Sequence, residues 1–371
     1  MRQPHITALG VAVPAYLIKQ EDAPDWIATY LALPAKELRK LKLIYRASGI
    51  DTRYSVIPDF SYTTQRVLFP LSEDLEPFPT TAQRMQIYQR EALPLALQAI
   101  RSMNLPKNYL SRITHLIVVS CTGMYAPGLE IDLINALSLT PCVQRLCVHF
   151  MGCYAAFSAL KIADAICRAD PQAKVLIADV ELCTLHFQKV YNQDQLLANA
   201  LFADGAAAAL VECVCPEEGL LSLEGFYSTL VPAESNSMAW HISDHGFQMQ
   251  LSSYVPYIIG SEIYSFVEKI RQDAKTNFDY YAFHPGGKKI LLEIEQAIGI
   301  TAQQNSWSYQ VMRHFGNMSS ATIFFVLQRL IAQLKERSRQ EGKTLLAAAF
   351  GPGLVVEAAV MQIKNLHFSH A

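Results

Sequence analysis

The stretch Phe150-Met151-Gly152-Cys153-Tyr154-Ala155-Ala156-Phe157-Ser158-Ala159-Leu160 decides how the chain is interpreted. It follows a strand-like run at 143–149 and leads into apolar residues at helical spacing as far as Ile166. Gly152 permits a sharp backbone turn, which predicts Cys153 in the first turn of a helix. There a thiol faces unpaired N–H groups and the positive end of the helix dipole, and both are expected to lower its pKa. The alternative is that Cys153 is a small buried side chain beneath the helix start, as free cysteines often are.

The length and composition of the chain favour a large, well-packed soluble protein. Its 371 residues are too many for one simple core and suit two packed halves. Hydrophobic residues make up 51% and charged residues only 17%, so we expect extensive buried surface, with scope for a subunit interface. The formal net charge of −2 argues against nucleic-acid binding, although a local basic patch can still hold phosphates.

Cysteine spacing and hydropathy indicate the compartment. The eight cysteines form no Cys-x-x-Cys pair and no zinc-binding set, and their scatter is typical of reduced thiols in a cytosol. The first residues lack the features of a secretory signal, and no run reaches the roughly eighteen apolar residues that cross a bilayer. We therefore expect a cytoplasmic protein without a bound metal and without membrane insertion.

Strand-like and helix-like segments alternate along the chain, and the alternation restarts near Cys215. Strands are expected at 6–13, 113–120, 143–149, 174–180, 201–211, 220–227, 280–283, 344–350 and 354–361. Helices are expected at 23–43 with a break near Pro34, at 81–103, after Cys153, and at 253–275, 288–298 and 320–339, with a serine-rich loop at 228–244. The same order of elements twice predicts a duplicated, layered α/β fold with halves at 1–215 and 216–371.

Three reactive side chains stand where an expected strand gives way to a helix: Cys153, His284 and Asn317. Such junctions are where open α/β sheets present catalytic groups. These residue types suit acyl transfer, because a thiolate can attack a carbonyl while an imidazole and a carboxamide N–H stabilise the negative oxygen. Structural alternatives exist, since His284 can cap a turn and Asn317 can cap a helix. His149 is a competing partner for the thiol, although its strand position is expected to point it away.

Several motifs follow one another in the order of a known family. They are Gly152-Cys153, FADGAAA at 202–208, HPGG at 284–287, GNMSSA at 316–321 and FGPGL at 350–354, together with Ser48-Gly49-Ile50 and Arg53-Tyr54. In this respect the whole chain resembles the type III polyketide synthases (chalcone synthase-like) of the thiolase superfamily. The resemblance implies a thiolase-like fold, in which two βαβαβ-type halves form an αβαβα sandwich. It also implies a homodimer that uses acyl-CoA and malonyl-CoA and holds no permanent cofactor.

The resemblance assigns roles to the three reactive residues. Cys153 would carry the starter acyl group, and His284 and Asn317 would promote decarboxylation of malonyl-CoA and stabilise the enolate and the oxyanion. Phe202 would act as a gate between the CoA tunnel and the cavity. The predicted function is thus decarboxylative condensation of malonyl-CoA units onto a starter held on Cys153, followed by cyclisation.

Further positions are assigned by the same resemblance. The substrate pocket is expected to include Phe202, Met249, His186, Trp240, Thr122, Ser319, Gly286 and Gly287; the CoA phosphates are expected near Lys40, Lys42 and Arg46; and Gly351, Pro352 and Gly353 are expected to shape the cavity floor as scaffold. Plant members carry an aromatic residue at Met249, a very small one at Trp240 and a small hydroxyl at His186. These departures indicate a bacterial-type member, and the bulk of Trp240 is expected to shrink or redirect the cavity.

Other functions remain open on the sequence alone. A ketoacyl synthase III-like enzyme also uses Cys, His and Asn, but takes malonyl from a carrier protein and stops after one condensation. A cysteine hydrolase is disfavoured, because the residues around Cys153 do not match such enzymes. A non-catalytic acyl-CoA-binding scaffold is disfavoured by the intact triad. The starter, the number of condensations and the mode of cyclisation stay undetermined.

Overall fold

A nine-stranded mixed sheet forms the frame of the computed structural model, which describes residues 3–61, 65–106, 108–231, 236–338 and 340–370. The order is β11-β12-β13-β8-β1-β7-β6-β4-β5. These strands are β1 (Gln3–Ala12), β4 (His115–Ser120), β5 (Gln144–His149), β6 (Lys174–Leu182), β7 (Asp204–Val214), β8 (Leu221–Leu230), β11 (Tyr280–Phe283), β12 (Thr344–Gly351) and β13 (Val355–Ile363). Two hairpins stand apart: β2 (Tyr16–Lys19) with β3 (Thr52–Ser55), and β9 (Met238–Ser243) with β10 (Gly246–Leu251).

The two ends of the sheet repeat one pairing scheme. In the order β1-β7-β6-β4, two antiparallel pairings are followed by a parallel one. The order β8-β13-β12-β11 shows the same sequence of pairings. Within the described residues, the two sets of strands pair with each other at His5 and Ile6 of β1 and Ser222 and Leu221 of β8. The sheet is therefore two similar halves joined along a short seam.

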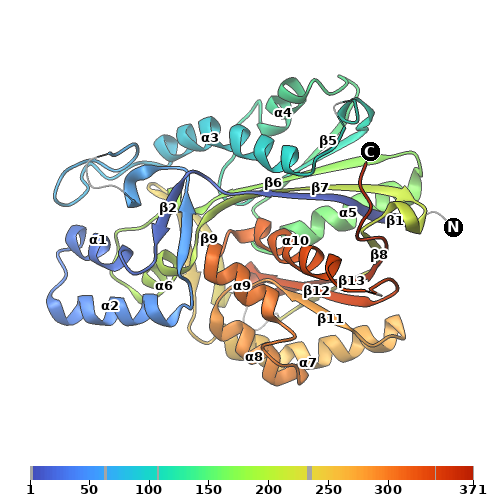
Figure 1. Ribbon diagram of the computed structural model, residues 1–371. Coiled ribbons are helices and arrows are strands. Elements are labelled where there is room, and N and C mark those ends of the chain that lie inside the picture. The colour runs from blue at the N-terminus through green and yellow to red at the C-terminus, as the bar shows by residue number, and fades with distance from the viewer. Residues whose placement is uncertain (1–2, 62–64, 107, 232–235, 339, 371) are drawn as a thin grey trace.

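Helices form three layers around these halves (Figure 1). The helices are α1 (Ala23–Tyr30), α2 (Ala35–Ala47), α3 (Thr81–Ser102), α4 (Leu129–Leu137), α5 (Ala155–Ala169), α6 (Gln193–Leu201), α7 (Val255–Ala274), α8 (Lys288–Ile298), α9 (Ser306–Phe315) and α10 (Thr322–Lys335). In one core, α5 and α10 pack between the two halves of the sheet. Helices α3 and α4 cover the outer face of one half, and α7 and α8 cover that of the other. No helix among the described residues combines the length and the apolar character needed to cross a membrane.

The local sequence explains why the central layer is helical and buried. In α5 the run from Ala155 to Leu160 is buried on every side, and in α10 so is the run from Thr322 to Leu327. A helix that is apolar all round belongs inside a protein. In β7 the buried run Ala206–Ala209 offers only methyl groups, which lets helices from both sides approach closely.

Most predicted elements are present, but the segment at 228–244 was predicted wrongly as a loop. Strand β8 continues to Leu230, and residues 238–243 form β9, which pairs with β10; residues 232–235 lie outside the described part. Helix α9 was not predicted either. In α9 the buried Trp307, Val311 and Met312 stand at helical spacing, which the prediction overlooked. The order of β9 depends on its pairing with β10, which its own residues do not specify.

A matched pair of substitutions tests whether the central layer holds the fold together. Leu327 in α10 is 0% exposed, whereas Leu43 in α2 is 61% exposed. Leu327→Ala should lower the free energy of unfolding by about 2–5 kcal/mol, because it leaves a cavity in a packed core. Leu43→Ala should change it by less than about 0.5 kcal/mol. Urea unfolding monitored by circular dichroism measures both, and similar losses for the two variants would contradict the layered description.

Candidate active site

The turn that carries Cys153 is held by a contact between the two halves. Phe150 and Gly152 both have positive φ, at 59° and 81°. A Cβ added to Gly152 would lie 2.1 Å from Cδ of Pro352, which belongs to the other half. Only glycine combines that backbone conformation with that approach. The Gly152 carbonyl accepts a hydrogen bond from the Ala155 amide at 2.9 Å, so Cys153 lies in the turn just before α5 and not within its first turn.

The expectation that the Cys153 pKa is lowered was wrong for the substrate-free protein. The residue is only 7% exposed, and burial raises the pKa of its thiol to about 12. Hydrogen bonds from Ser319 and Asn317 oppose this rise, while the charge of Glu181 adds to it. Desolvation of the thiolate raises the pKa more than the nearby helix start lowers it, because the thiol is buried away from water.

His284 follows β11 and presents an unpaired imidazole. Its backbone amide donates to the Ala348 carbonyl at 2.8 Å, which fixes the residue beside β12. The side chain is 1% exposed, and neither ring nitrogen has a hydrogen-bond partner among the described residues. Burial lowers the pKa of His284 to about 3, so the ring is neutral at physiological pH. A neutral ring has one nitrogen that donates and one that accepts a hydrogen bond.

Asn317 joins the two halves through its backbone and is oriented through its side chain. Its amide donates to the Leu201 carbonyl at 2.9 Å, and its carbonyl accepts from the Ala203 amide at 2.8 Å. Its side-chain oxygen accepts from the Ser319 amide at 2.9 Å, while its Nδ2 lies 3.5 Å from the Gly286 carbonyl. With the oxygen held in this way, the carboxamide presents its N–H groups as donors, towards the Gly286 carbonyl and the Cys153 sulfur. The residue is not the cap of α10, which begins at Thr322.

Cys153, His284 and Asn317 line one narrow chamber. The structure thus brings together three residues that lie far apart in the sequence, while His149 stays outside with its Nδ1 3.1 Å from the Ser120 carbonyl. Predicted pocket residues that share this chamber are Thr122, Phe202, Trp240, Met249, Gly286, Ser319 and Pro352; residues not predicted are Cys121, Cys183, Met238, Leu251, Ile290 and Phe350.

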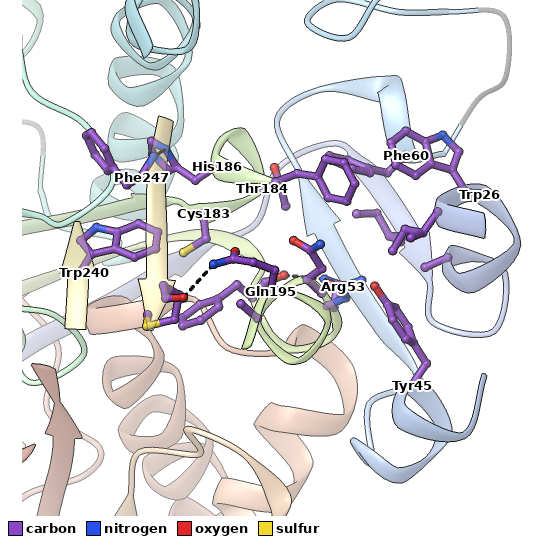
Figure 2. A pocket seen from close by; sticks show the side chains of 18 residues that line it. Trp26, Tyr45, Arg53, Phe60, Cys183, Thr184, His186, Gln195, Trp240 and Phe247 are labelled. Carbon is purple, nitrogen blue, oxygen red and sulfur yellow. Dashed lines mark hydrogen bonds between the residues drawn. The ribbon is translucent and has the colours of Figure 1, made fainter. Parts of the chain in front are cut away.

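A second chamber lies next to the first, towards the N-terminal helices (Figure 2). Cys183, Phe202, Trp240 and Met249 line both chambers and form the wall between them. The far side of the second chamber is lined by residues that the sequence analysis did not single out, among them Trp26, Tyr45, Phe60, Phe187 and Gln195. They come from separate elements and share no motif, so only the folded chain brings them together.

An aromatic group fixes one side of the second chamber. Trp240 donates its indole N–H to the Cys121 carbonyl at 2.8 Å. The His186 ring stacks on Phe247 with centroids 4.1 Å apart, with Nε2 2.7 Å from the Thr122 carbonyl and Nδ1 accepting from the Phe247 amide. Burial lowers the pKa of His186 to about 3, so it remains neutral. The rings of Trp240 and His186 are thus held in place on this side of the chamber, because each of their polar ring atoms has a hydrogen-bond partner.

A groove of about 310 Å³ lies next to the first chamber, with which it shares Leu251, Gly286 and Ile290. Its lining includes the predicted Gly286 and Gly287 and also Lys288 and Lys289, which were not predicted. Of the three basic residues expected near CoA phosphates, none lines the groove. Lys40 pairs with Glu37 and Lys42 with Asp25 on the surface, and Arg46 is exposed on the same helix α2.

Two buried carboxylates that the sequence analysis missed support the chamber from β6. Glu181 accepts hydrogen bonds from the Cys121 amide and the Thr122 hydroxyl at 2.9 and 2.7 Å. The Ser320 hydroxyl lies within hydrogen-bond distance of both Asp179 and Glu181. Burial raises the pKa of each carboxyl group. The pair therefore fastens the loop after β4 to the segment after Asn317.

The protonation of Cys153 can be tested by alkylation of the substrate-free protein. Because burial raises its pKa, the thiolate fraction should increase about tenfold for each pH unit across the neutral range. Peptide mass spectrometry after timed exposure to iodoacetamide measures the rate, with the exposed Cys142 as a reference for the reagent. A rate that is already independent of pH at about pH 6 would contradict the neutral state and indicate a thiolate paired with His284.

Comparison with solved structures agrees with this architecture. The crystal structure of PKS-I from the brown alga Ectocarpus siliculosus superposes with a TM-score of 0.90 at 28% identity, covering 98% of this chain and 99% of that one. The type III polyketide synthase domain of Steely1, a type I/III hybrid from Dictyostelium, superposes with a TM-score of 0.87 at 28% identity, with the same coverage. The predicted layered, thiolase-like α/β fold is confirmed.

Sequence comparison gives the family. "Alpha-pyrone synthesis polyketide synthase-like Pks18" of Mycobacterium tuberculosis is 29% identical over 370 residues, covering 96% of this chain and 91% of that protein. "Probable polyketide synthase 1" of Dictyostelium discoideum is 29% identical over 367 residues, and this chain spans 11% of its length. Residues 2–214 and 223–364 match the family models described as the N-terminal and C-terminal domains of chalcone and stilbene synthases. The chain therefore belongs to the chalcone and stilbene synthase family, and it is an enzyme of the type III polyketide synthase kind.

Proposed function

We propose that this enzyme condenses malonyl-CoA units, with loss of CO₂, onto an acyl-CoA starter that is held on Cys153. The observation that carries the proposal is the neutral, unpaired imidazole of His284, buried in one chamber with the Cys153 thiol and the Asn317 carboxamide. A buried polar group without a partner is unfavourable, and it is typical of a site that a substrate completes.

Loading of the starter is the first step. His284 accepts the proton of the Cys153 thiol as sulfur attacks the thioester carbonyl, and the bond to CoA sulfur breaks. The departing CoA thiolate takes the proton from His284. The acyl group then remains on Cys153, and free CoA leaves through the groove. The raised thiol pKa makes this coupled proton transfer necessary, because little thiolate exists before the substrate arrives.

Condensation follows in the same chamber. The Nε2–H or Nδ1–H of the neutral His284 and the N–H of Asn317 donate to the thioester oxygen of malonyl-CoA. The carboxylate leaves as CO₂, and its bonding electrons form the enolate that these donors stabilise. The enolate carbon attacks the acyl carbonyl on Cys153, and the thiolate is released. The product is a ketoacyl-CoA that is two carbons longer, which can return to Cys153 for another cycle.

The two chambers suggest where the acyl group lies. The chamber around Cys153 and the second chamber have cavity volumes of about 40 and 50 Å³, so an extended acyl chain needs both. We place that chain past the wall formed by Phe202, Met249, Trp240 and Cys183, in the second chamber. Phe202 and Met249 then act as the gate. Trp240 and His186 have large side chains, and they narrow the second chamber at positions where plant members have small residues.

The groove is the proposed path for CoA, which enters only with the substrates. Lys288 and Lys289 line the groove and are the nearest candidates for its phosphates. Lys40, Lys42 and Arg46 are also candidates for binding CoA phosphates further from the chamber, because Ile44 and Ala47 of the same helix α2 line the groove. Gly351, Pro352 and Gly353 act as scaffold, since Pro352 holds the Cys153 turn.

We also propose the assembly and the location. A homodimer is favoured because β5 is an edge strand and its Leu146 is 44% exposed, which offers an unpaired edge with an apolar side chain. A cytoplasmic location is favoured because all eight cysteines are free thiols. The division at 1–215 and 216–371 is favoured by the repeated pairing scheme on the two sides of the seam.

The proposed roles are tested by incubation with malonyl-CoA and a panel of acyl-CoAs. Cys153→Ala should abolish acylation, measured as the mass of the intact protein. Asn317→Ala should load the starter but release CO₂ about 10²–10³-fold more slowly, because it removes one donor to the developing oxyanion. His284→Ala should slow CO₂ release by a similar factor and should also load the starter more slowly, because it removes the base for the Cys153 thiol. His149→Ala is the matched control for a histidine outside the chamber and should release CO₂ at the wild-type rate.

Different results identify the other candidates. Normal CO₂ release in both His284→Ala and Asn317→Ala would contradict the assigned roles. A single condensation that requires carrier-bound malonyl would indicate the ketoacyl synthase-like enzyme. Neither acylation nor turnover would indicate a binding scaffold. An α-pyrone is the first product to seek, because the name of the mycobacterial relative states that synthesis.

A further inference from the structure

The far end of the second chamber carries polar side chains within a mostly aromatic and aliphatic lining. Tyr45, from the last turn of α2, reaches this end and is 1% exposed. No described residue accepts a hydrogen bond from its hydroxyl, whereas the Arg53 guanidinium acts on the hydroxyl oxygen as a donor. Figure 2 shows the hydroxyl directed towards Arg53, at the side of the chamber away from Trp240. Burial raises the pKa of Tyr45 to about 12, so the hydroxyl keeps its proton and remains a donor.

Arg53 is the neighbour of this hydroxyl, with its guanidinium carbon 5.8 Å from the centre of the Tyr45 ring. The side chain is 5% exposed. It donates to the side-chain oxygen of Gln20 at 2.8 Å, to the Asn199 carbonyl at 2.9 Å and to the Phe202 carbonyl at 2.6 Å. All three acceptors are uncharged. Within the described residues, no carboxylate forms an ion pair with Arg53.

The carboxyl group that acts on Arg53 electrostatically is that of Asp204, and its hydrogen bonds go elsewhere. Its oxygens accept from the amides of Val56 and Thr184 and from the Thr184 hydroxyl, at 2.7–2.8 Å. Burial raises the pKa of Asp204 to about 7, so its charge is not complete at neutral pH. The end of the chamber therefore combines an unpaired donor with a buried cation that is not fully compensated, and this combination attracts an acceptor oxygen.

From this we infer that the second chamber selects a starter acyl group whose far end carries a hydrogen-bond-accepting oxygen, which the Tyr45 hydroxyl binds beside Arg53. The inference rests on the proposed function, because it requires the acyl chain on Cys153 to extend past Phe202 and Met249. The apolar lining, which includes Ile18, Ile27 and Phe60, then contacts the body of the acyl group. A starter that ends in a methyl group leaves the Tyr45 donor buried without a partner, and such sites discriminate strongly.

The test is competitive loading of Cys153 with matched acyl-CoA pairs. Each pair has the same chain length, from butanoyl to dodecanoyl, and ends either in a methyl group or in an oxygen, as an ω-hydroxy or an ω-carboxy acyl group. Intact-protein mass spectrometry gives the ratio of the two adducts. At the chain length that reaches the end of the chamber, we expect the oxygenated member to be preferred about tenfold. A preference for the ω-carboxy form over the ω-hydroxy form would assign the larger share of this discrimination to the charge of Arg53.

Tyr45→Phe keeps the ring and removes only the donor, so it should bring the ratio close to one. Tyr309→Phe is the control for the loss of a hydroxyl elsewhere, because Tyr309 lines neither chamber. Its ratio should equal that of the wild type. Arg53 itself is left unchanged, because its loss would free two backbone carbonyls near Phe202.

The outcomes separate the inference from the proposed function. Loading and extension of methyl-ended starters at every length, with no preference for oxygen, would overturn the inference and leave the condensing activity intact. An oxygen preference that persists in Tyr45→Phe would overturn the role of Tyr45. Failure of every acyl-CoA to acylate Cys153 would overturn both.

Discussion

The reactive residues of this enzyme meet because the backbone of Asn317 is hydrogen bonded on both sides to the segment 201–203 of the other half. The Asn317 amide and carbonyl bond to the Leu201 carbonyl and the Ala203 amide. The contact of Gly152 with Pro352 is the second link across the halves. Together they bring the Cys153 turn, the Asn317 carboxamide and Phe202 to one place. Neither half contains a complete chamber alone.

Burial sets the chemistry of that chamber. It raises the pKa of Cys153 to about 12 and lowers that of His284 to about 3, so both groups are neutral before substrate binds. A neutral pair avoids the desolvation of two charges in a closed site. It also leaves His284 with a donor and an acceptor nitrogen, which suits both proton transfer from sulfur and hydrogen bonding to an oxyanion. The site is thus arranged for charges that arise only during the reaction.

The sequence predicted the parts of the molecule that local pattern and motif determine. The alternation of apolar segments predicted the layered α/β fold, and the strand-to-helix junctions predicted Cys153 and His284. Asn317 shares their chamber, but the junction predicted for it was wrong, because it follows helix α9 and not a strand. It did not predict the direction of the Cys153 pKa shift, because a helix start is visible in the sequence whereas closure to solvent is not. The hairpin of β9 and β10 was missed for a related reason: its order depends on tertiary contacts.

The second chamber is the clearest example of a feature that depends on tertiary contacts and that the sequence did not predict. Trp26 and Tyr45 come from different helices near the N-terminus, whereas Trp240 comes from β9 in the other half. No spacing in the chain connects them.

The central claim is that an acyl group on Cys153 spans both chambers, and a crystal structure of the enzyme incubated with its starter acyl-CoA tests it most directly. Our account predicts electron density for a thioester on Cys153, its oxygen near His284 and Asn317, and its chain beyond Phe202 towards Tyr45. An acyl group that is bound to another residue, or that runs back into the groove, would contradict it.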